Sequence, residues 1–197
     1  MPMPPNFIFP DWPALPHSYP PHIKTATTTH QADNLALHVD DNHVIVQANR
    51  QKLIQSLELL ATPVWLNQIH SNQIISLNQL PTSPPTADAA YCNVRQRVCA
   101  ILTADCLPIL ITGTKGCEIA AVHAGWRGLA GIINYILLQC LKAPPNDLLV
   151  WLGARYRPLG SEVGEEVRQA FLNRHTDYQK AFTTHKDDRS GWLTFIS

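Results

Sequence analysis

The sequence predicts an α+β fold, a mixed α/β sandwich, because strand-like and helix-like segments follow one another in irregular order. Short apolar runs of strand composition alternate with segments whose apolar residues recur at helical spacing. The chain has 197 residues, of which 45% are hydrophobic, so it can fill one substantial core but is cramped for two. We therefore expect a single domain over residues 1–197.

The amino-terminal part predicts an extended arm, a helix and one or two strands. Eight of the 16 prolines lie within residues 1–21, and proline opposes both helix and central strand, so this segment is expected to be an irregular arm. Apolar residues then recur near helical spacing over residues 42–60, with Asn42 as a plausible N-cap. Residues 63–77 are rich in β-branched and aromatic side chains and predict strands, with His70 near a strand end.

The remainder of the chain predicts more strands and two further helices. Apolar runs at 98–103 and 107–112 predict buried strands that are interrupted by Ala104, Asp105 and Cys106. The run from Glu118 predicts a strand that enters a glycine-containing turn before a helix. Further patterns predict a strand and a second helix, and the expected ranges are 131–141 for the first helix, 148–152 for the strand and 161–181 for the second helix.

Charge and composition exclude several classes of partner. Lys plus Arg and Asp plus Glu number 15 each, which gives a formal net charge of zero and no electrostatic reason to expect nucleic acid or an anionic membrane. The longest apolar runs are far shorter than the roughly 20 residues that span a bilayer. The amino terminus lacks the basic start and continuous apolar run of a secretory signal, so we expect a cytoplasmic protein.

Three side chains at predicted strand ends are candidate metal ligands. The five cysteines show no C-x-x-C spacing, which argues against a disulfide framework or a zinc knuckle. Histidine and cysteine are nevertheless the side chains that bind zinc best, and a catalytic zinc has three protein ligands and an open fourth position. His70, Cys106 and His123 fit this set, although their spacing matches no local zinc motif.

The sequence resembles the laccase-domain family, whose members are described as multicopper polyphenol oxidase-like proteins and as purine nucleoside phosphorylases. The most specific match is HAGWRG at 123–128. Further matching segments are FPDWPA at 9–14, ANR at 48–50, NQIH at 67–70, ADAAY at 87–91, ILTADCLPILI at 101–111 and SEVGEEV at 161–167. The likeness therefore extends over essentially the whole chain.

The resemblance implies a fold, a metal site and an activity. The family fold is a mixed α/β sandwich related to that of a cysteine–histidine hydrolase toxin, and the family's zinc ligands correspond to His70, Cys106 and His123. The implied activities are phosphorolysis of adenosine, inosine, guanosine and methylthioadenosine, with adenosine deamination. The implied cofactor is Zn²⁺, copper being the weaker candidate, and the implied partners are purine nucleosides and phosphate.

Three further residues are candidates for catalysis or substrate binding. Arg127 offers a planar, charged fork in a glycine-flanked turn ahead of a predicted helix, which suits phosphate, although it could instead form a structural ion pair. Asp105 could orient a ligand histidine or carry protons, or it could cap a turn. Glu162 matches a glutamate of the family's Y/F-E-V-G segment and is a candidate substrate-binding residue, but a carboxylate is also favoured at the start of any helix.

The sequence departs from the family pattern at several points. It has GARYRP from Gly153 where the family has G-P-x-I-G, and Ser161 stands at the aromatic position. It ends at GWLTFIS, so it is expected to lack the family's C-terminal segment and any pocket wall which that segment supplies.

Alternative functions follow from the same residues. Cys106 could be the nucleophile and His123 the base of a metal-independent thiol hydrolase. A copper-dependent phenol oxidase is a further possibility, although true laccases need many more histidines. The departures from the family pattern suggest a third alternative, a shortened and catalytically impaired binding protein.

Overall fold

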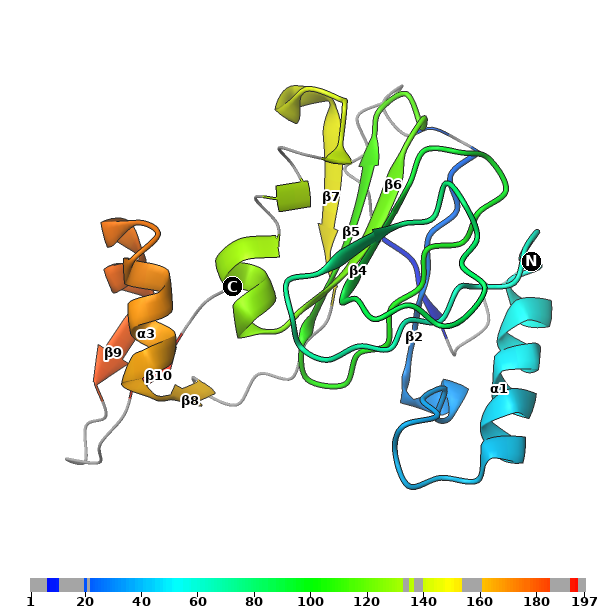
Figure 1. Cartoon of the computed structure of the whole chain (residues 1–197), viewed down its shortest axis with the longest axis horizontal. Coiled ribbons are helices and arrows are strands. Elements are labelled where there is room, and N and C mark those ends of the chain that lie inside the picture. Colours follow the sequence, from blue (N-terminus) through cyan, green and yellow to red (C-terminus); the bar gives the residue numbers. More distant parts are fainter. Residues whose placement is uncertain are drawn as a thin grey trace.

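The fold is built around a mixed five-stranded sheet. The computed structural model describes residues 7–10, 20, 22–132, 135–136, 140–153, 161–184 and 192–194. The strands of the sheet are β3 (Ile74–Ser76), β4 (Ala89–Cys92), β5 (Leu107–Gly113), β6 (Ile119–Ala124) and β7 (Leu148–Leu152). Their order is β3-β4-β6-β5-β7, with β3 and β4 parallel and the other pairs antiparallel (Figure 1). Together with the helices, this mixed sheet confirms the predicted α+β class.

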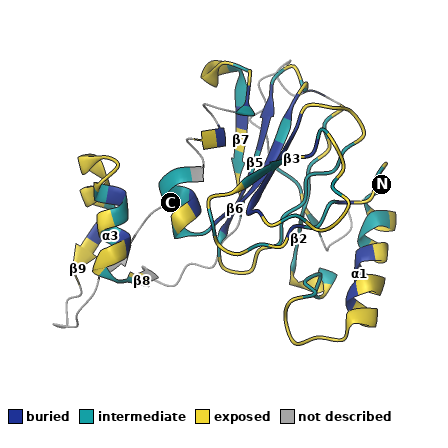
Figure 2. Cartoon of the chain, in the orientation of Figure 1, coloured by how far each residue is buried: buried dark blue, intermediate teal, exposed yellow. Residues whose placement is uncertain are grey.

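Both faces of the central sheet are covered. Alternate residues of β4 belong to different apolar clusters: Ala89 and Tyr91 pack with residues of β5, β6 and Ile136, whereas Ala90 and Cys92 pack with Leu66 and its neighbours. Successive side chains of a strand point to opposite faces, so β4 must be covered by two layers. Figure 2 shows the result, in which the buried residues are concentrated in the central strands.

The first long helix forms as the sequence predicts. Helix α1 (His43–Ser56) begins after Asn42, whose side chain accepts a hydrogen bond from the Val44 N–H, so the predicted N-cap is confirmed. The helix ends before the predicted residue 60 because Leu57 leaves helical geometry and Glu58 has a φ of 47°. The other elements before the central sheet are β1 (Phe7–Ile8), β2 (Thr27–Thr28) and the short helix η1 (His30–Ala32).

A smaller layer follows β7 in the sequence. It contains the three-stranded sheet β8-β10-β9 and helix α3, which lie on the other side of the central sheet from α1 (Figure 1). Its elements are β8 (Ser161–Val163), α3 (Glu165–Leu172), η5 (Thr176–Ala181), β9 (Phe182–Thr184) and β10 (Trp192–Thr194), whereas the short helices η2 (Gly128–Ile132) and η4 (Pro145–Asp147) lie earlier, between β6 and β7. Val167, Phe171 and Phe182 of this layer pack against Trp126 and Leu129, which follow β6. This contact joins the smaller layer to the segment after His123.

One predicted helix is corrected by these elements, and another lies partly outside the described residues. The helix expected over 161–181 is wrong in its extent, because Ser161–Val163 pairs with β10 as strand β8 and the helical segment is divided. His175 breaks it with an extended backbone and accepts a hydrogen bond from the Asp177 N–H, so it caps the start of η5. Of the helix expected over 131–141, residues 133–134 and 137–139 lie outside the described residues, and most of the proline arm does too.

The strand expected over 98–103 is also absent. This segment makes a single bridge, between Cys99 and Val64. The Leu102 main chain instead forms two hydrogen bonds with the Gln68 side chain. Gln68 Nε2 donates to the Leu102 carbonyl at 2.8 Å, and Gln68 Oε1 accepts from the Leu102 N–H at 2.7 Å. A glutamine amide thus replaces a neighbouring strand and ties the segment before Cys106 to the segment before His70.

A buried carboxylate stabilises the segment that leads to β7. Glu118 accepts hydrogen bonds from the Lys142 and Ala143 N–H groups and from the Tyr91 hydroxyl. Burial and the adjacent negative charge of Glu118 raise the pKa of Tyr91 to about 12, so the phenol remains a donor.

Among the described residues, no helix is long and apolar enough to cross a membrane.

Candidate metal centre

The three predicted ligands come from separate segments that meet at one end of the sheet. His123 lies in β6, Cys106 immediately precedes β5, and His70 lies in the bend that precedes β3. Strands β5 and β6 are antiparallel, with Leu107 opposite Ala124, so the residues just outside this pair, Cys106 and Gly125, lie next to each other.

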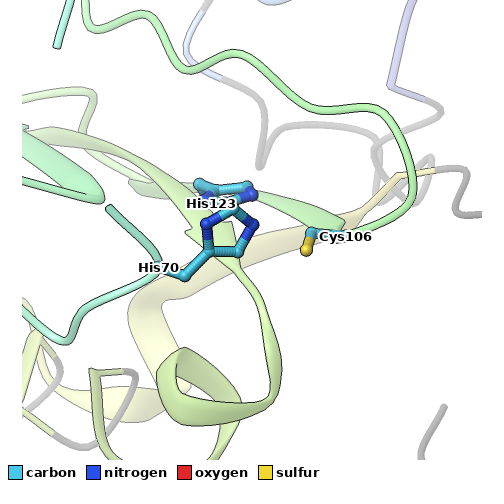
Figure 3. A group of neighbouring side chains, drawn as sticks. All are labelled: His70, Cys106 and His123. Atoms are coloured by element: carbon cyan, nitrogen blue, oxygen red, sulfur yellow. The ribbon is translucent and has the colours of Figure 1, made fainter. Parts of the chain in front are cut away.

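The ligand atoms of the three side chains converge. One donor atom from each of His70, Cys106 and His123 lies within 4.8 Å of the other two. The two imidazole rings contact edge to face, with centroids 4.8 Å apart, and Figure 3 shows the Cys106 sulfur across from them. These three residues, of which His70 and His123 are 53 positions apart in the sequence, thus form one cluster, which we call the His–Cys–His group.

Gly125 lies directly beside this group. A β-carbon placed on Gly125 would lie 3.4 Å from His70 Cδ2 and 3.5 Å from Cys106 Sγ. The glycine backbone therefore lies directly against two of the three side chains, in the segment just after β6. Both distances correspond to ordinary van der Waals contact, so the segment after β6 packs directly against the group.

The three side chains of the group differ strongly in their exposure to solvent. His123 is only 4% exposed, Cys106 is half-buried and His70 is exposed. The group is thus anchored in the core on the His123 side and accessible to solvent on the His70 side. A catalytic site needs this combination, because its ligands must be rigid while a small molecule can still reach it.

Asp88 fixes the orientation of His123. Its side chain has no exposed surface, and its Oδ1 lies 2.9 Å from His123 Nδ1. Burial opposes the charge, but hydrogen bonds from His123, Ser71 and Ile69 outweigh it and lower the pKa of Asp88. A carboxylate only accepts, so His123 Nδ1 is the donor of this hydrogen bond and Nε2 is the ring nitrogen left for the group.

The same carboxylate holds the bend at His70. Asp88 Oδ1 accepts from the His70 N–H at 3.0 Å, and Oδ2 accepts from the Ser71 N–H, the Ser71 hydroxyl and the Ile69 N–H at 2.6, 2.7 and 3.3 Å. His70 has a φ of 56°, a conformation that strains a residue with a β-carbon by about 1–3 kcal/mol. The converging N–H groups offset this strain by binding one anion.

The donor set fits a metal ion of the zinc class. Two imidazoles and one thiol match the ligand types of zinc sites that keep an open position. Burial, together with the nearby negative charges of Asp105 and Asp88, raises the pKa of the Cys106 thiol. A bound cation would offset all three effects, since its charge favours the thiolate.

The other predicted site residues lie around this group or apart from it. Asp105 is exposed beside Cys106. Arg127 is exposed too, with its guanidinium carbon 4.2 Å from the centre of the Trp126 ring. Glu162 is an exposed residue of β8 in the smaller layer and is not a member of the His–Cys–His group.

Sequence reasoning missed Asp88, the carboxylate that contacts a ligand histidine. In the sequence the candidate for this role is Asp105, which is adjacent to Cys106, whereas in the structure the carboxylate that contacts His123 is Asp88. The available signal was a single aspartate directly before the apolar strand β4. A buried carboxylate at such a place needs several hydrogen-bond donors.

Comparison with known proteins places the chain among related sequences. The family model described as multi-copper polyphenol oxidoreductase laccase matches residues 24–195. Purine nucleoside phosphorylase YfiH of Shigella flexneri is 42% identical over 154 residues, which cover 78% of this chain and 63% of that protein. Purine nucleoside phosphorylase PA4543 of Pseudomonas aeruginosa is 37% identical over 185 residues, 89% of this chain and 73% of that protein.

Solved structures agree with this placement. The crystal structure of Neisseria meningitidis protein NMB0706 superposes with a TM-score of 0.83 at 33% identity, covering 96% of this chain and 78% of that one. The chain spans 63% of the length of the first YfiH relatives that it matches. On the match over residues 24–195 and on these likenesses, the chain belongs to the family described as multi-copper polyphenol oxidoreductase laccase.

Proposed function

We propose that this protein is a zinc-dependent purine nucleoside phosphorylase that also deaminates adenosine. The observation that carries the proposal is the open His–Cys–His group in a chain similar to proteins named purine nucleoside phosphorylases. The proposed substrates are phosphate with adenosine, inosine, guanosine or methylthioadenosine. Zinc is preferred to copper because two imidazoles and one thiolate, with a fourth position open, are typical of catalytic zinc.

Residues of this chain have distinct tasks in the proposed reactions. A zinc ion held by His70, Cys106 and His123 would supply Lewis acidity and lower the pKa of water. Asp88 keeps the His123 proton on Nδ1, and the exposed side at His70 admits the nucleoside. Asp105 is an exposed carboxylate beside Cys106 and is the proposed proton carrier between the site and solvent.

Phosphorolysis also needs a site for the phosphate anion. A phosphate oxygen forms the bond to the ribose C1′ while the bond from C1′ to the purine nitrogen breaks, and the base leaves with a proton. Arg127 is the proposed clamp, because its charged fork is exposed just after the strand that carries His123 and stacks on Trp126. Glu162 is assigned to substrate binding through the resemblance of its segment to the family.

A second candidate function has one observation in its favour. Cys106, His123 and Asp88 also resemble a nucleophile, a base and an orienting carboxylate, since His123 is hydrogen-bonded to Asp88 and shares a cluster with Cys106. In such a hydrolase Cys106 would act without metal, and His70 would have no assigned task. The full donor set therefore favours the metal enzyme.

The test of the proposed function is release of hypoxanthine from inosine by the 197-residue protein. We expect release that depends on added phosphate and yields ribose 1-phosphate in equal amount. With adenosine we expect inosine and ammonia as well as adenine. If the zinc-loaded protein releases no base from any of the four nucleosides, the proposal is wrong, and the result favours the alternative of a catalytically impaired binding protein.

Replacing Arg127 with alanine is expected to weaken phosphorolysis much more than deamination. A charged hydrogen bond to phosphate contributes roughly 1.5–3 kcal/mol, which corresponds to about a 10- to 100-fold loss. Deamination uses water instead of phosphate and is expected to stay within about threefold. The measurement is the phosphate dependence of the inosine reaction beside the adenosine deamination rate.

The matched control for this substitution is Arg95→Ala, which removes an exposed arginine from the loop after β4. The control is expected to leave both reactions unchanged. Equal losses of phosphorolysis and deamination in Arg127→Ala would show that Arg127 is structural.

A further inference from the structure

We propose that Asp88 is the positioning residue that assembles the metal centre, because its one carboxylate fixes both ligand histidines. It orients His123 through the imidazole ring and His70 through the main chain. This inference rests on the zinc site of the proposed function, but it concerns assembly of the site and not turnover. It assigns no contact with substrate to Asp88.

A single oxygen atom connects the two histidines. Asp88 Oδ1 accepts from His123 Nδ1 at 2.9 Å and from the His70 N–H at 3.0 Å. The His70 and His123 rings contact each other, so a shift of this oxygen changes both ligands together. The distance between the two donors therefore depends on one buried atom.

Main-chain hydrogen bonds on both sides of Asp88 hold this residue in position. The Asp88 carbonyl accepts from the His123 N–H at 2.8 Å, and the Asp88 N–H donates to the Gln73 carbonyl at 3.0 Å. Strand β4 begins at the next residue, and Ala89 is paired with Val122 of β6. The carboxylate is thus anchored between the strand that carries His123 and the bend that carries His70.

The charge of Asp88 is as important as its shape. Its two oxygens together accept four N–H groups and one hydroxyl, with at least two donors at each oxygen. An asparagine has the same shape but replaces one oxygen by an NH₂ donor. Either orientation of the amide therefore directs its N–H groups at other donors.

The two amide orientations have different consequences. An NH₂ at the Oδ2 position would face the N–H groups of Ile69 and Ser71 and disturb the strained bend at His70. An NH₂ at the Oδ1 position would face His123 Nδ1, which could accept only if the imidazole proton moved to Nε2. That shift would block the nitrogen that faces the metal.

The experiment measures zinc affinity of Asp88→Asn by competition with a chromophoric chelator. We expect affinity to fall about 10- to 100-fold, the usual effect of losing a group that orients a metal ligand. Asp177→Asn is the control, since it neutralises an exposed carboxylate in η5 and is expected to bind zinc as the wild type does. Far-UV circular dichroism checks that each variant is folded.

A second measurement uses the unaltered sequence and so does not depend on folding of the variant. Nitrogen-15 NMR of zinc-free wild type, with His123→Ala for assignment, is expected to show the His123 proton on Nδ1. A proton on Nε2, or zinc binding by folded Asp88→Asn within threefold of wild type, would overturn the inference. Wild type that binds no zinc would contradict the proposed function, while the NMR result would still decide the role of Asp88.

Discussion

Replacing Cys106 with serine is expected to remove both the metal and the activity. A neutral hydroxyl is a far poorer zinc donor than a thiolate, and Cys106 is one of only three side chains in the His–Cys–His group. Loss of a direct ligand is expected to exceed the roughly 10- to 100-fold effect of losing a group behind a ligand. Zinc content and phosphate-dependent release of base from inosine should therefore fall together, and His123→Ala should behave in the same way.

The control for Cys106→Ser is Cys117→Ser. Cys117 is an exposed thiol in the turn between β5 and β6 and is expected to tolerate the change with full zinc content. The two enzyme hypotheses both predict an inactive Cys106→Ser protein, so activity alone does not separate them. A Cys106→Ser protein that retained a full complement of zinc would show that Cys106 is not a ligand.

Removal of metal from the wild type is expected to abolish phosphorolysis and deamination, and adding zinc back should restore both. Because hydrogen bonds to Asp88 hold the main chain of His70 and the ring of His123, the zinc-free protein is expected to keep its fold and accept zinc again. The metal-independent thiol hydrolase predicts the opposite, namely resistance to chelators.

Thiol alkylation provides the second arm of this test. It is best done in the Cys117→Ser background, because Cys117 is exposed and would react in any case. Bound zinc is expected to protect Cys106 from alkylation, and protection should disappear when the metal is removed. Equal alkylation rates with and without zinc would contradict a zinc–thiolate bond.

The sequence predicted those elements whose formation depends on local pattern. Helix α1 has a recurrent apolar spacing and an asparagine cap, while β5, β6 and β7 are apolar runs of strand length. These signals are contained within each segment. The same is true of HAGWRG, which indicated the position of His123.

Elements that depend on distant partners were not predictable in this way. Strand β4 is Ala-Ala-Tyr-Cys, which shows no alternation because it is covered on both faces. The apolar run at 98–103 has strand composition but is held by the Gln68 side chain instead of a strand. In both cases tertiary contacts override local preference.

The residues of the site also divide into those that the sequence identified and one that depends on distant contacts. His70, Cys106 and His123 were identified from the segments that resemble the family, and the structure brings them together. Asp88 was missed because its task depends on the pairing of β4 with β6 and on the bend at His70. No spacing along the chain reveals that one carboxylate contacts residues 18 and 35 positions away.

The most direct test of the central claim is elemental analysis of the wild-type protein through the cycle of chelation and reconstitution. Protein purified without chelators should contain close to one zinc per chain, because the His–Cys–His group offers one set of three ligands. Chelation should remove that zinc together with activity, and reconstitution should return both in equal proportion. Protein that contains no zinc, does not bind added zinc and yet remains active would contradict the zinc-dependent function.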